Sequence, residues 1–217
     1  MKRTIILASS NKGKIKEIKE IFKDYEVLSL KEAEARLGKK LEVVENQPTF
    51  KENALEKTRC LYNLVGEDYI CIGDDSGISI DAIGGFPGVH TARWMDADDH
   101  VKNLHLLEKM KDKEDRTCHY TTVIALVKKD FEKTFEYTLD GNLTYEVRGD
   151  NGFGFDEIFE LDNGKTLAEI STEEKFLISP RKKALEKIEE YITMWNEKVN
   201  SSFNIFDENL VLHKIPV

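Results

Sequence analysis

The sequence predicts an α/β fold, because short apolar runs alternate along it with helical patterns of apolar residues. Residues 4–8 and 69–72 are apolar and contain β-branched side chains, as buried strands do. Stretches that begin near Lys12 and Pro48 instead repeat apolar residues with the period of an amphipathic helix. A chain of 217 residues suits one larger α/β domain or two small lobes, and it can bury a substantial core.

Composition excludes several classes of protein. Charged residues make up 34% and hydrophobic residues 40% of the chain, and the formal net charge is −9. Nucleic acids and anionic membranes attract basic surfaces, so we expect neither as a partner. Cys60, Cys71 and Cys118 form no CxxC pair, which argues against a zinc site or a disulfide framework. The apolar run near Met1 is too short for a signal peptide or a membrane span, so we expect a cytoplasmic protein.

The first part of the chain is expected to contain three strands and two helices. The strands are predicted at residues 4–8, 26–30 and 41–44. Ser9, Ser10 and Asn11 supply cap chemistry for the helix that begins near Lys12, and Pro48 is favoured at the start of the second helix. The expected apolar faces are Ile15, Ile18 and Ile21 or Phe22 in the first helix, and Phe50, Ala54, Leu61 and Leu64 in the second.

The second part is expected to contain long strands and further helices. Residues 118–127 predict a strand, and 131–147 predict a hairpin or paired long strands around a turn at 140–142. Helices are predicted at 98–111, 173–175 and 179–195. Their expected apolar faces are Val101, Leu104 and Leu107 in the first, and Ala184, Leu185, Ile188, Tyr191, Ile192 and Trp195 in the last.

The end of the chain differs from the body. Residues 200–217 are apolar and do not continue the helical pattern, so we expect them to dock on the body, add an edge strand or join a subunit interface. We therefore divide the chain into a domain at 1–199 and a C-terminal extension at 200–217.

The stretch GDDSGISIDAIGGFPGVHTAR, residues 73–93, follows the apolar run at 69–72. Carboxylates at the end of a strand are suitable ligands for a hard cation such as Mg²⁺. If Asp74 and Asp75 are extended, their side chains point to opposite faces, and only one of them faces any given site. The alternative is an acidic turn in which Ser76 and Gly77 are turn residues.

Two lysines occupy positions where a cation needs an explanation. The turn at residues 9–14 precedes a helix, and a helix N-terminus binds phosphate through its free N–H groups and dipole. Lys14 adds a positive charge there, which is unfavourable unless an anion is near. A surface turn without a ligand is the alternative. Lys57 lies on the apolar stripe of the second helix, where its ammonium either reaches water or binds an anion.

A loop rich in glycine and phenylalanine, NGFGFDEIF, follows at residues 151–159. Aromatic rings held by glycines can stack on a flat base, and Asp156 can accept hydrogen bonds from ring N–H groups. The phenylalanines can equally be core residues at a strand bend, and the sequence leaves both interpretations open.

Five motifs taken together resemble one family. SNKGK, TFKENALEK, the 73–93 stretch, GFGFDEIF and EEKFLISPRKKAL occur in an order similar to that of the inosine triphosphate pyrophosphatases, or Ham1-like family. The resemblance runs from about residue 5 to about residue 191. It implies an elongated α/β fold with a twisted mixed sheet flanked by helices, two lobes with a central cleft, and a homodimer. It also implies Mg²⁺-dependent hydrolysis of ITP, dITP and XTP to the monophosphate and pyrophosphate.

The resemblance also implies roles for individual residues. Glu45 and Asp75 would bind Mg²⁺, and Asp75 would be the catalytic proton acceptor. Lys57 would contact the triphosphate, and Ser76 would lie at the substrate. The other implied substrate-binding residues are Ser9, Ser10, Asn11, Lys12, Gly13 and Lys14 for the triphosphate, and Phe153, Gly154, Phe155, Asp156, Lys175 and Arg181 for the base.

The chain departs from the family pattern at two positions. Pro180 stands where the family usually has a histidine that helps to read the base, and Glu157 stands where proline is common. Pro180 has no side-chain donor, so altered base selectivity with the same chemistry is an alternative hypothesis. A nucleotide-binding regulator without turnover is a further alternative, against which the presence of Glu45 and Asp75 argues.

Overall fold

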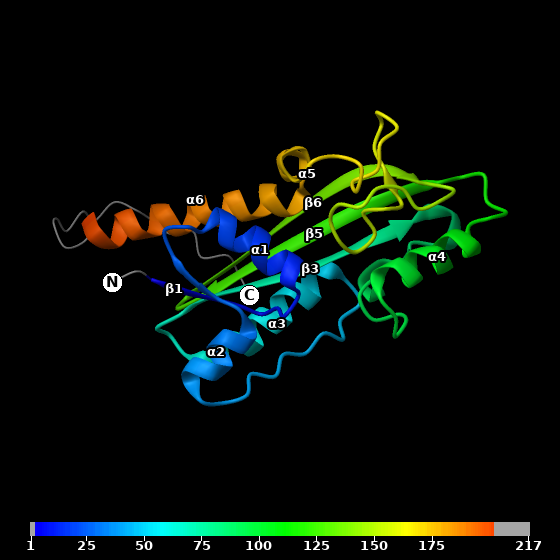
Figure 1. The fold of residues 1–217 in the computed structure, drawn as a ribbon. Helices are drawn as coiled ribbons and strands as arrows, with labels where there is room; N and C mark the ends of the chain where they lie inside the picture. Colours follow the sequence, from blue (N-terminus) through cyan, green and yellow to red (C-terminus); the bar gives the residue numbers. More distant parts are fainter. Residues whose placement is uncertain (1–2, 202–217) are drawn as a thin grey trace.

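The computed structural model describes residues 3–201 and contains one mixed, seven-stranded sheet (Figure 1). The strand order is β2–β1–β3–β5–β6–β7, with β4 paired to the outer part of β3. The strands are β1 (Thr4–Leu7), β2 (Glu26–Leu28), β3 (Ile70–Ile80), β4 (Phe86–Pro87), β5 (Thr117–Lys128), β6 (Phe131–Leu143) and β7 (Phe159–Glu160). β1 pairs in parallel with β2 and β3, whereas β3, β5 and β6 are antiparallel neighbours. The predicted α/β fold with a mixed sheet is confirmed.

Helices cover both faces of this sheet. They are α1 (Lys12–Ile21), α2 (Leu30–Leu37), α3 (Phe50–Val65), α4 (Asp99–Lys109), α5 (Thr172–Ile178) and α6 (Pro180–Ser201), with short 3-10 turns η1 (Asp81–Ile83) and η2 (Gly88–His90). Alternate residues of β5 serve the two faces, as the period of a strand requires. Ile124 and Leu126 pack in one cluster with α1 and α6, while Val123 and Ala125 pack against Ala54 of α3.

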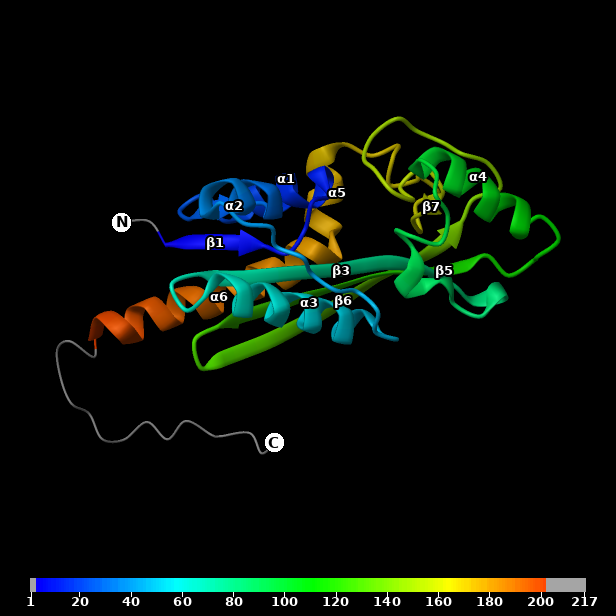
Figure 2. The same cartoon turned by 90° about the horizontal axis from the view of Figure 1, so that it is seen from below.

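The molecule is elongated along β3, β5 and β6. Figures 1 and 2 show β1 and α2 near one end of these strands and α4 near the other, and Figure 2 shows β7 beside α4. A separate apolar cluster fills the α4 end, where Leu106 and Met110 pack with Phe155 and Phe159. No described helix is long and apolar enough to cross a bilayer. The α6 helix continues through Ser201, and the predictions for the rest of the extension, 202–217, lie outside the described residues.

The interpretation of residues 74–77 as a turn is wrong, because they lie in the middle of β3. The glycines of this strand instead permit close approach of neighbouring elements. A Cβ at Gly73 would lie 2.0 Å from Thr58 Oγ1 of α3, and one at Gly77 would lie 2.6 Å from the Gly88 carbonyl oxygen. Both clashes are too short for any other residue. Glycine at these positions reflects packing against β3 rather than a reversal of the chain.

Two other local predictions are wrong, and one helix was not predicted. Residues 41–44 form no strand, because Leu41 is buried while its N–H donates to Glu34 Oε1 of α2 rather than to a sheet. The sequence reasoning also missed α2, whose capping box is Ser29 with Glu32. The turn expected at 140–142 lies instead at 129–130, where Asp130 has a φ of 54°, and 140–142 pair with β5.

Some helical faces also differ from expectation. In α4 the buried residues are Asn103 and Leu106, whereas Val101 and Leu104 are exposed. Leu64 of α3 is exposed, and Tyr191 and Trp195 of α6 are only partly covered, with their rings beside Phe131. The α3 helix begins at Phe50, because the side chain of Thr49 accepts a hydrogen bond from the backbone N–H of Glu52 and caps the N-terminus of the helix.

Candidate functional site

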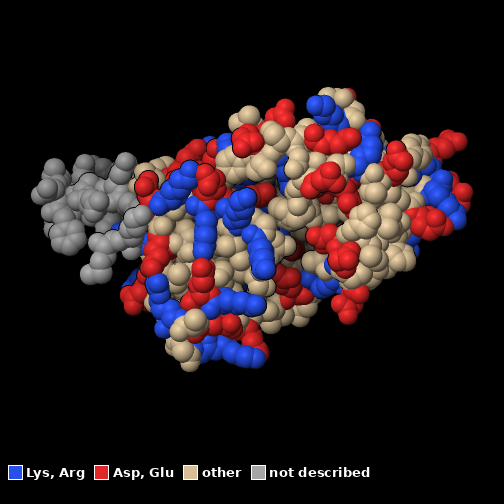
Figure 3. Space-filling view, viewed as in Figure 1, with Lys and Arg blue, Asp and Glu red and all other residues tan. Residues whose placement is uncertain are grey.

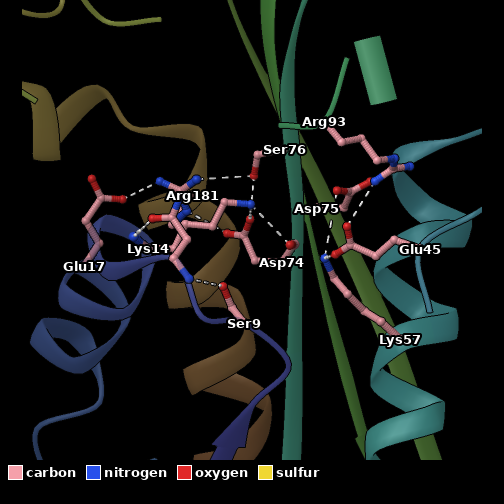
Figure 4. A network of polar contacts seen from close by, with 11 residues as sticks. Ser9, Lys14, Glu17, Glu45, Lys57, Asp74, Asp75, Ser76, Arg93 and Arg181 are labelled. Carbon is pink, nitrogen blue, oxygen red and sulfur yellow. Dashed lines mark hydrogen bonds and ion pairs between the residues drawn. The ribbon is translucent and has the colours of Figure 1, made fainter. Parts of the chain in front are cut away.

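Strand β3 separates two clusters of charged side chains that lie on its opposite faces (Figure 4). Asp74 points toward α1 and α6, and Asp75 points toward α3. This arrangement is the alternation that two successive residues of a strand must show. Of the two carboxylates, only Asp75 therefore faces Glu45, and Asp74 belongs to a different set of partners.

Asp74 is the centre of a buried ion-pair network. Its Oδ2 accepts from Arg181 Nε at 2.6 Å, and its Oδ1 lies 2.5 Å from Lys14 Nζ. Glu17 Oε2 binds the other side of the Arg181 guanidinium, with 2.5 Å between Oε2 and Nη1. Burial alone would raise the pKa of Asp74, but Arg181 and Lys14 hold it well below its usual range. Both the carboxylate and the guanidinium are therefore charged and paired in the interior.

The second cluster contains Asp75, Glu45, Lys57 and Arg93. Lys57 is 2% exposed, and its ammonium binds Glu45 Oε1 and lies 3.9 Å from Asp75 Oδ1. Arg93 Nη1 donates to the other oxygen of Glu45 at 3.1 Å. The alternative in which Lys57 reaches water is wrong, because its ammonium is buried among carboxylates.

Asp75 has an oxygen without a protein partner. Its Oδ2 is buried and makes no hydrogen bond. Burial raises the pKa of Asp75, against the opposing effect of Lys57. Burial would also raise the pKa of Glu45, but there the ammonium of Lys57 prevails and the pKa is lowered. The two carboxylates thus differ in basicity although they share Lys57.

Carboxylate oxygens such as those of Glu45 and Asp75 are the type of ligand that a hard divalent cation prefers. Mg²⁺ is usually held by one or two carboxylates together with substrate phosphates and water, rather than by a closed protein cage. Within residues 3–201, no group of three or more histidine, cysteine or acidic side chains is placed to hold a metal. The orphaned Oδ2 of Asp75 is the atom most in need of such a partner.

The turn before α1 lies beside the Asp74 cluster. Asn11 caps the helix by accepting the Lys14 N–H at 3.1 Å, and Ser9 Oγ accepts the Asn11 N–H. Ser10, Asn11 and Lys12 are exposed, whereas Lys14 reaches inward to Asp74. Burial lowers the pKa of Lys14, although Asp74 opposes this shift. The anion that the sequence required near Lys14 is a carboxylate of the protein itself.

The glycine-aromatic loop contacts α1 through Gly13 and α5 through Lys175. A Cβ at Gly13 would meet the Phe153 ring at 2.7 Å, so glycine is needed where α1 passes the loop. Lys175 Nζ lies 4.5 Å from the centre of the Phe153 ring, and it binds Asp156 Oδ2. Asp156 Oδ2 also accepts the Phe153 N–H at 2.8 Å. Phe153 is thus half-buried beside cations, whereas Phe155 lies in the core against Tyr120.

Comparison with known proteins explains this grouping of motifs. Residues 5–191 match the model of the Ham1 family. The dITP/XTP pyrophosphatase of Sulfurimonas denitrificans is 40% identical over 191 residues, covering 83% of this chain and 94% of the relative. The enzyme of the same name from Caldanaerobacter subterraneus subsp. tengcongensis is 42% identical over 196 residues, covering 87% of this chain and 95% of the relative. The chain belongs to the Ham1 family.

Solved Ham1 structures share the fold. The Staphylococcus aureus Ham1 protein superposes with a TM-score of 0.77 at 32% identity and covers 88% of this chain and 98% of its own. A HAM1 protein from Coxiella burnetii gives a TM-score of 0.77 at 32% identity, with 89% and 100% of the two chains covered. The predicted resemblance is confirmed for the fold and the family.

Both departures from the Ham1 pattern have a local structural reason. Pro180 is buried at the first position of α6, where a helix N–H has no intrahelical acceptor and proline costs nothing. Glu157 accepts from Asn103 Nδ2 at 3.0 Å and lies 3.0 Å from His100 Nδ1. The loop that ends at Glu157 is thereby attached to α4.

The structure adds charged residues that sequence reasoning did not assign. From the sequence, Asp74 had no settled role and Glu17 had no role, and Arg93 was placed only as the last residue of the 73–93 stretch. A signal existed for Glu17, because it lies three residues after Lys14 and hence on the same side of α1. Arg93 comes from an irregular segment, so no period could place it beside Glu45.

Proposed function

We propose that this protein is a Mg²⁺-dependent nucleoside triphosphate pyrophosphohydrolase that converts ITP, dITP and XTP to the monophosphate and pyrophosphate. The names of its Ham1 relatives support the reaction class and the purine substrates. The observation that carries the proposal is the position of Asp75, whose carboxylate lies beside Glu45 and Lys57 on one face of β3 and keeps one buried oxygen, Oδ2, without a partner. We also propose that the protein is cytoplasmic and forms a homodimer. Sedimentation analysis can test the homodimer.

The cations of the site suit an anionic substrate in an acidic protein. Figure 3 shows lysine and arginine side chains gathered over the α1 and α2 side of the molecule, beside a hollow with acidic side chains at its rim. Lys14 and Lys57 approach β3 from opposite faces, and each forms an ion pair with a carboxylate. In the proposed complex the phosphate oxygens take over part of this pairing, and the N-terminus of α1 adds its free N–H groups.

Asp75 would act as the proton acceptor for the water that attacks the α-phosphorus. Its raised pKa makes it a stronger base than an ordinary aspartate, and its Oδ2 is available. Glu45 and Asp75 would hold Mg²⁺, which neutralises phosphate charge and acidifies bound water when present. Lys57 and Arg93 would stabilise the charge on the leaving pyrophosphate. The water oxygen becomes part of the monophosphate, and its proton passes to Asp75.

The base would be selected by the loop on the other side of β3. Phe153 offers a ring face beside Lys175 and Arg181, and the Arg181 guanidinium lies 5.8 Å from the centre of that ring. Arg181 is held by Asp74 and Glu17 and donates to Ser76 Oγ at 3.3 Å. A guanidinium fixed in this way can donate to a 6-oxo group without reorganising.

A panel of nucleotides tests the proposal. Pyrophosphate release would be measured with Mg²⁺ from ITP, dITP, XTP, GTP, ATP and dUTP, and again after chelation. We expect release from the first three to exceed release from the others and to require the metal. Release of phosphate in place of pyrophosphate would contradict the reaction. Tight nucleotide binding without release would favour a regulator.

A second candidate function is the same chemistry with altered base selectivity. Pro180 directly precedes Arg181 in α6 and provides no side-chain hydrogen bond to a base. Comparable rates on GTP and ITP would favour this candidate.

A further inference from the structure

Helix α4 holds the backbone of Gly154 from both sides. Asp99 Oδ2 accepts the Gly154 N–H at 2.8 Å, and Asn103 Nδ2 donates to the Gly154 carbonyl oxygen at 2.8 Å. The two side chains lie one turn apart on the same helix, so they meet the same residue of the loop. Gly154 has a φ of 66°, a conformation that leaves both of its peptide groups facing α4.

Asn103 has the chemistry and the burial of a positioning residue. It is 2% exposed on a helix whose neighbouring Leu104 is 45% exposed, so a polar side chain occupies the buried position and an apolar one the exposed position. Its Nδ2 donates to two acceptors, the Gly154 carbonyl and Glu157 Oε1. An amide with two donors satisfies both. The loss of that donor would leave the carbonyl without a partner at a buried interface.

The position of Gly154 determines the position of the Phe153 ring. Phe153 precedes Gly154 directly, and its ring is enclosed by Gly13, Lys175 and Arg181. On the other side of Gly154, Phe155 is packed in the core against Tyr120, with ring centres 4.9 Å apart. Gly154 therefore lies between the anchored ring of Phe155 and the half-buried ring of Phe153, and through it α4 can set the orientation of the Phe153 ring.

We propose that Asn103, assisted by Asp99, is a positioning residue that sets the selectivity for the base by fixing Gly154 and therefore the ring face of Phe153. This inference rests on the proposed function for its substrate, because the base is what Phe153 would contact. Asn103 acts through the loop, because its side-chain hydrogen bonds go to Gly154 and Glu157. Its effect is on the binding of the base and not on the attack at phosphorus, which takes place at Asp75 on the other face of β3.

The test compares Asn103→Asp with Leu104→Gln. Asn103→Asp keeps the size of the side chain but removes both donors, whereas Leu104→Gln changes the exposed neighbour on the same helix and serves as the control. The measurements are KM and kcat for ITP, the ratio of ITP to GTP activity, and amide hydrogen exchange over residues 152–158. Exchange reports on the loop whether or not the protein hydrolyses ITP.

For Asn103→Asp we expect KM for ITP to rise about tenfold, the ITP to GTP ratio to fall, and kcat to stay within about twofold. Loop amides should exchange faster while those of α1 and α6 keep their rates. The control should match the wild type. Unchanged loop exchange would overturn the inference, as would a loss of kcat and thermal stability with KM and selectivity unchanged. A wild type that releases no pyrophosphate would contradict the proposed function, and loop exchange would still decide the role of Asn103.

Discussion

Asp74 and Asp75 are neighbours in the chain, yet their carboxylates lie on opposite faces of β3 and pair with different lysines, Asp74 with Lys14 and Asp75 with Lys57. Asp74 is fully paired with cations, while Asp75 keeps one buried oxygen free. The same residue type therefore has two different environments at adjacent positions. We expect Asp74 to maintain the structure around Arg181 and Asp75 to take part in chemistry.

Asp75→Asn should abolish pyrophosphate release, with a loss of at least about 100-fold, because an amide cannot accept the proton. The fold should persist, since Asp75 Oδ2 makes no hydrogen bond that the change would remove. Pyrophosphate release and circular dichroism would be measured on the same preparation. Turnover near that of the wild type would remove Asp75 from the mechanism.

Asp74→Ala should destabilise the protein by about 3–5 kcal/mol, because it leaves the buried Arg181 guanidinium without its main partner. Urea unfolding of this variant measures the loss. Glu132→Ala is the matched control, since it breaks the exposed pair with Arg59 and should cost at most about 1 kcal/mol. Equal effects of the two changes would show that burial of the Asp74 network is not decisive.

Pro180→His should narrow selectivity toward 6-oxo purines that lack a 2-amino group. A histidine at the first position of α6 restores a side-chain donor beside Arg181, and one hydrogen bond to the base changes discrimination by about 1–3 kcal/mol. The ratio of kcat/KM for ITP and GTP measures the change. An unchanged ratio would show that this position does not read the base.

The pH dependence of stability should contain a contribution from His119. Its ring nitrogens lie 2.7 Å from Asp140 and 3.1 Å from Asp81, and the hydrogen bond with Asp140 is the main cause that raises its pKa. Because the folded pKa is raised, this stabilisation is complete below the unfolded pKa of about 6.5 and is lost as pH rises through the folded value.

Urea midpoints of the wild type and His119→Gln, compared across this pH range, isolate that contribution. The difference between the two proteins should shrink as pH rises, and the ring resonances of His119 should titrate above the ordinary value. A difference that grows with pH would contradict the assignment.

The family, the α/β class and most elements could be predicted from the sequence, because apolar period and cap residues act locally. β1, α1, β5 and α6 were expected close to their observed positions. The sequence did not decide between strand and turn for residues 74–77, because glycine is common in turns. The structure shows that Gly73 and Gly77 instead allow Thr58 and Gly88 to pack close to β3. Similarly, the turn of the long hairpin lies at Asp130 and not at the more turn-like 140–142.

The sequence by itself determined that acidic and basic residues with the chemistry for a nucleotide site are present, and that extended neighbours such as Asp74 and Asp75 must separate. Only the tertiary structure decided which partner each of them has. Glu17, Arg93 and Asn103 reach their partners across 164, 48 and 51 positions of the chain. Local patterns carry no information over such distances, because these contacts exist only once the packing of α1, α4 and α6 around the sheet has brought the segments together.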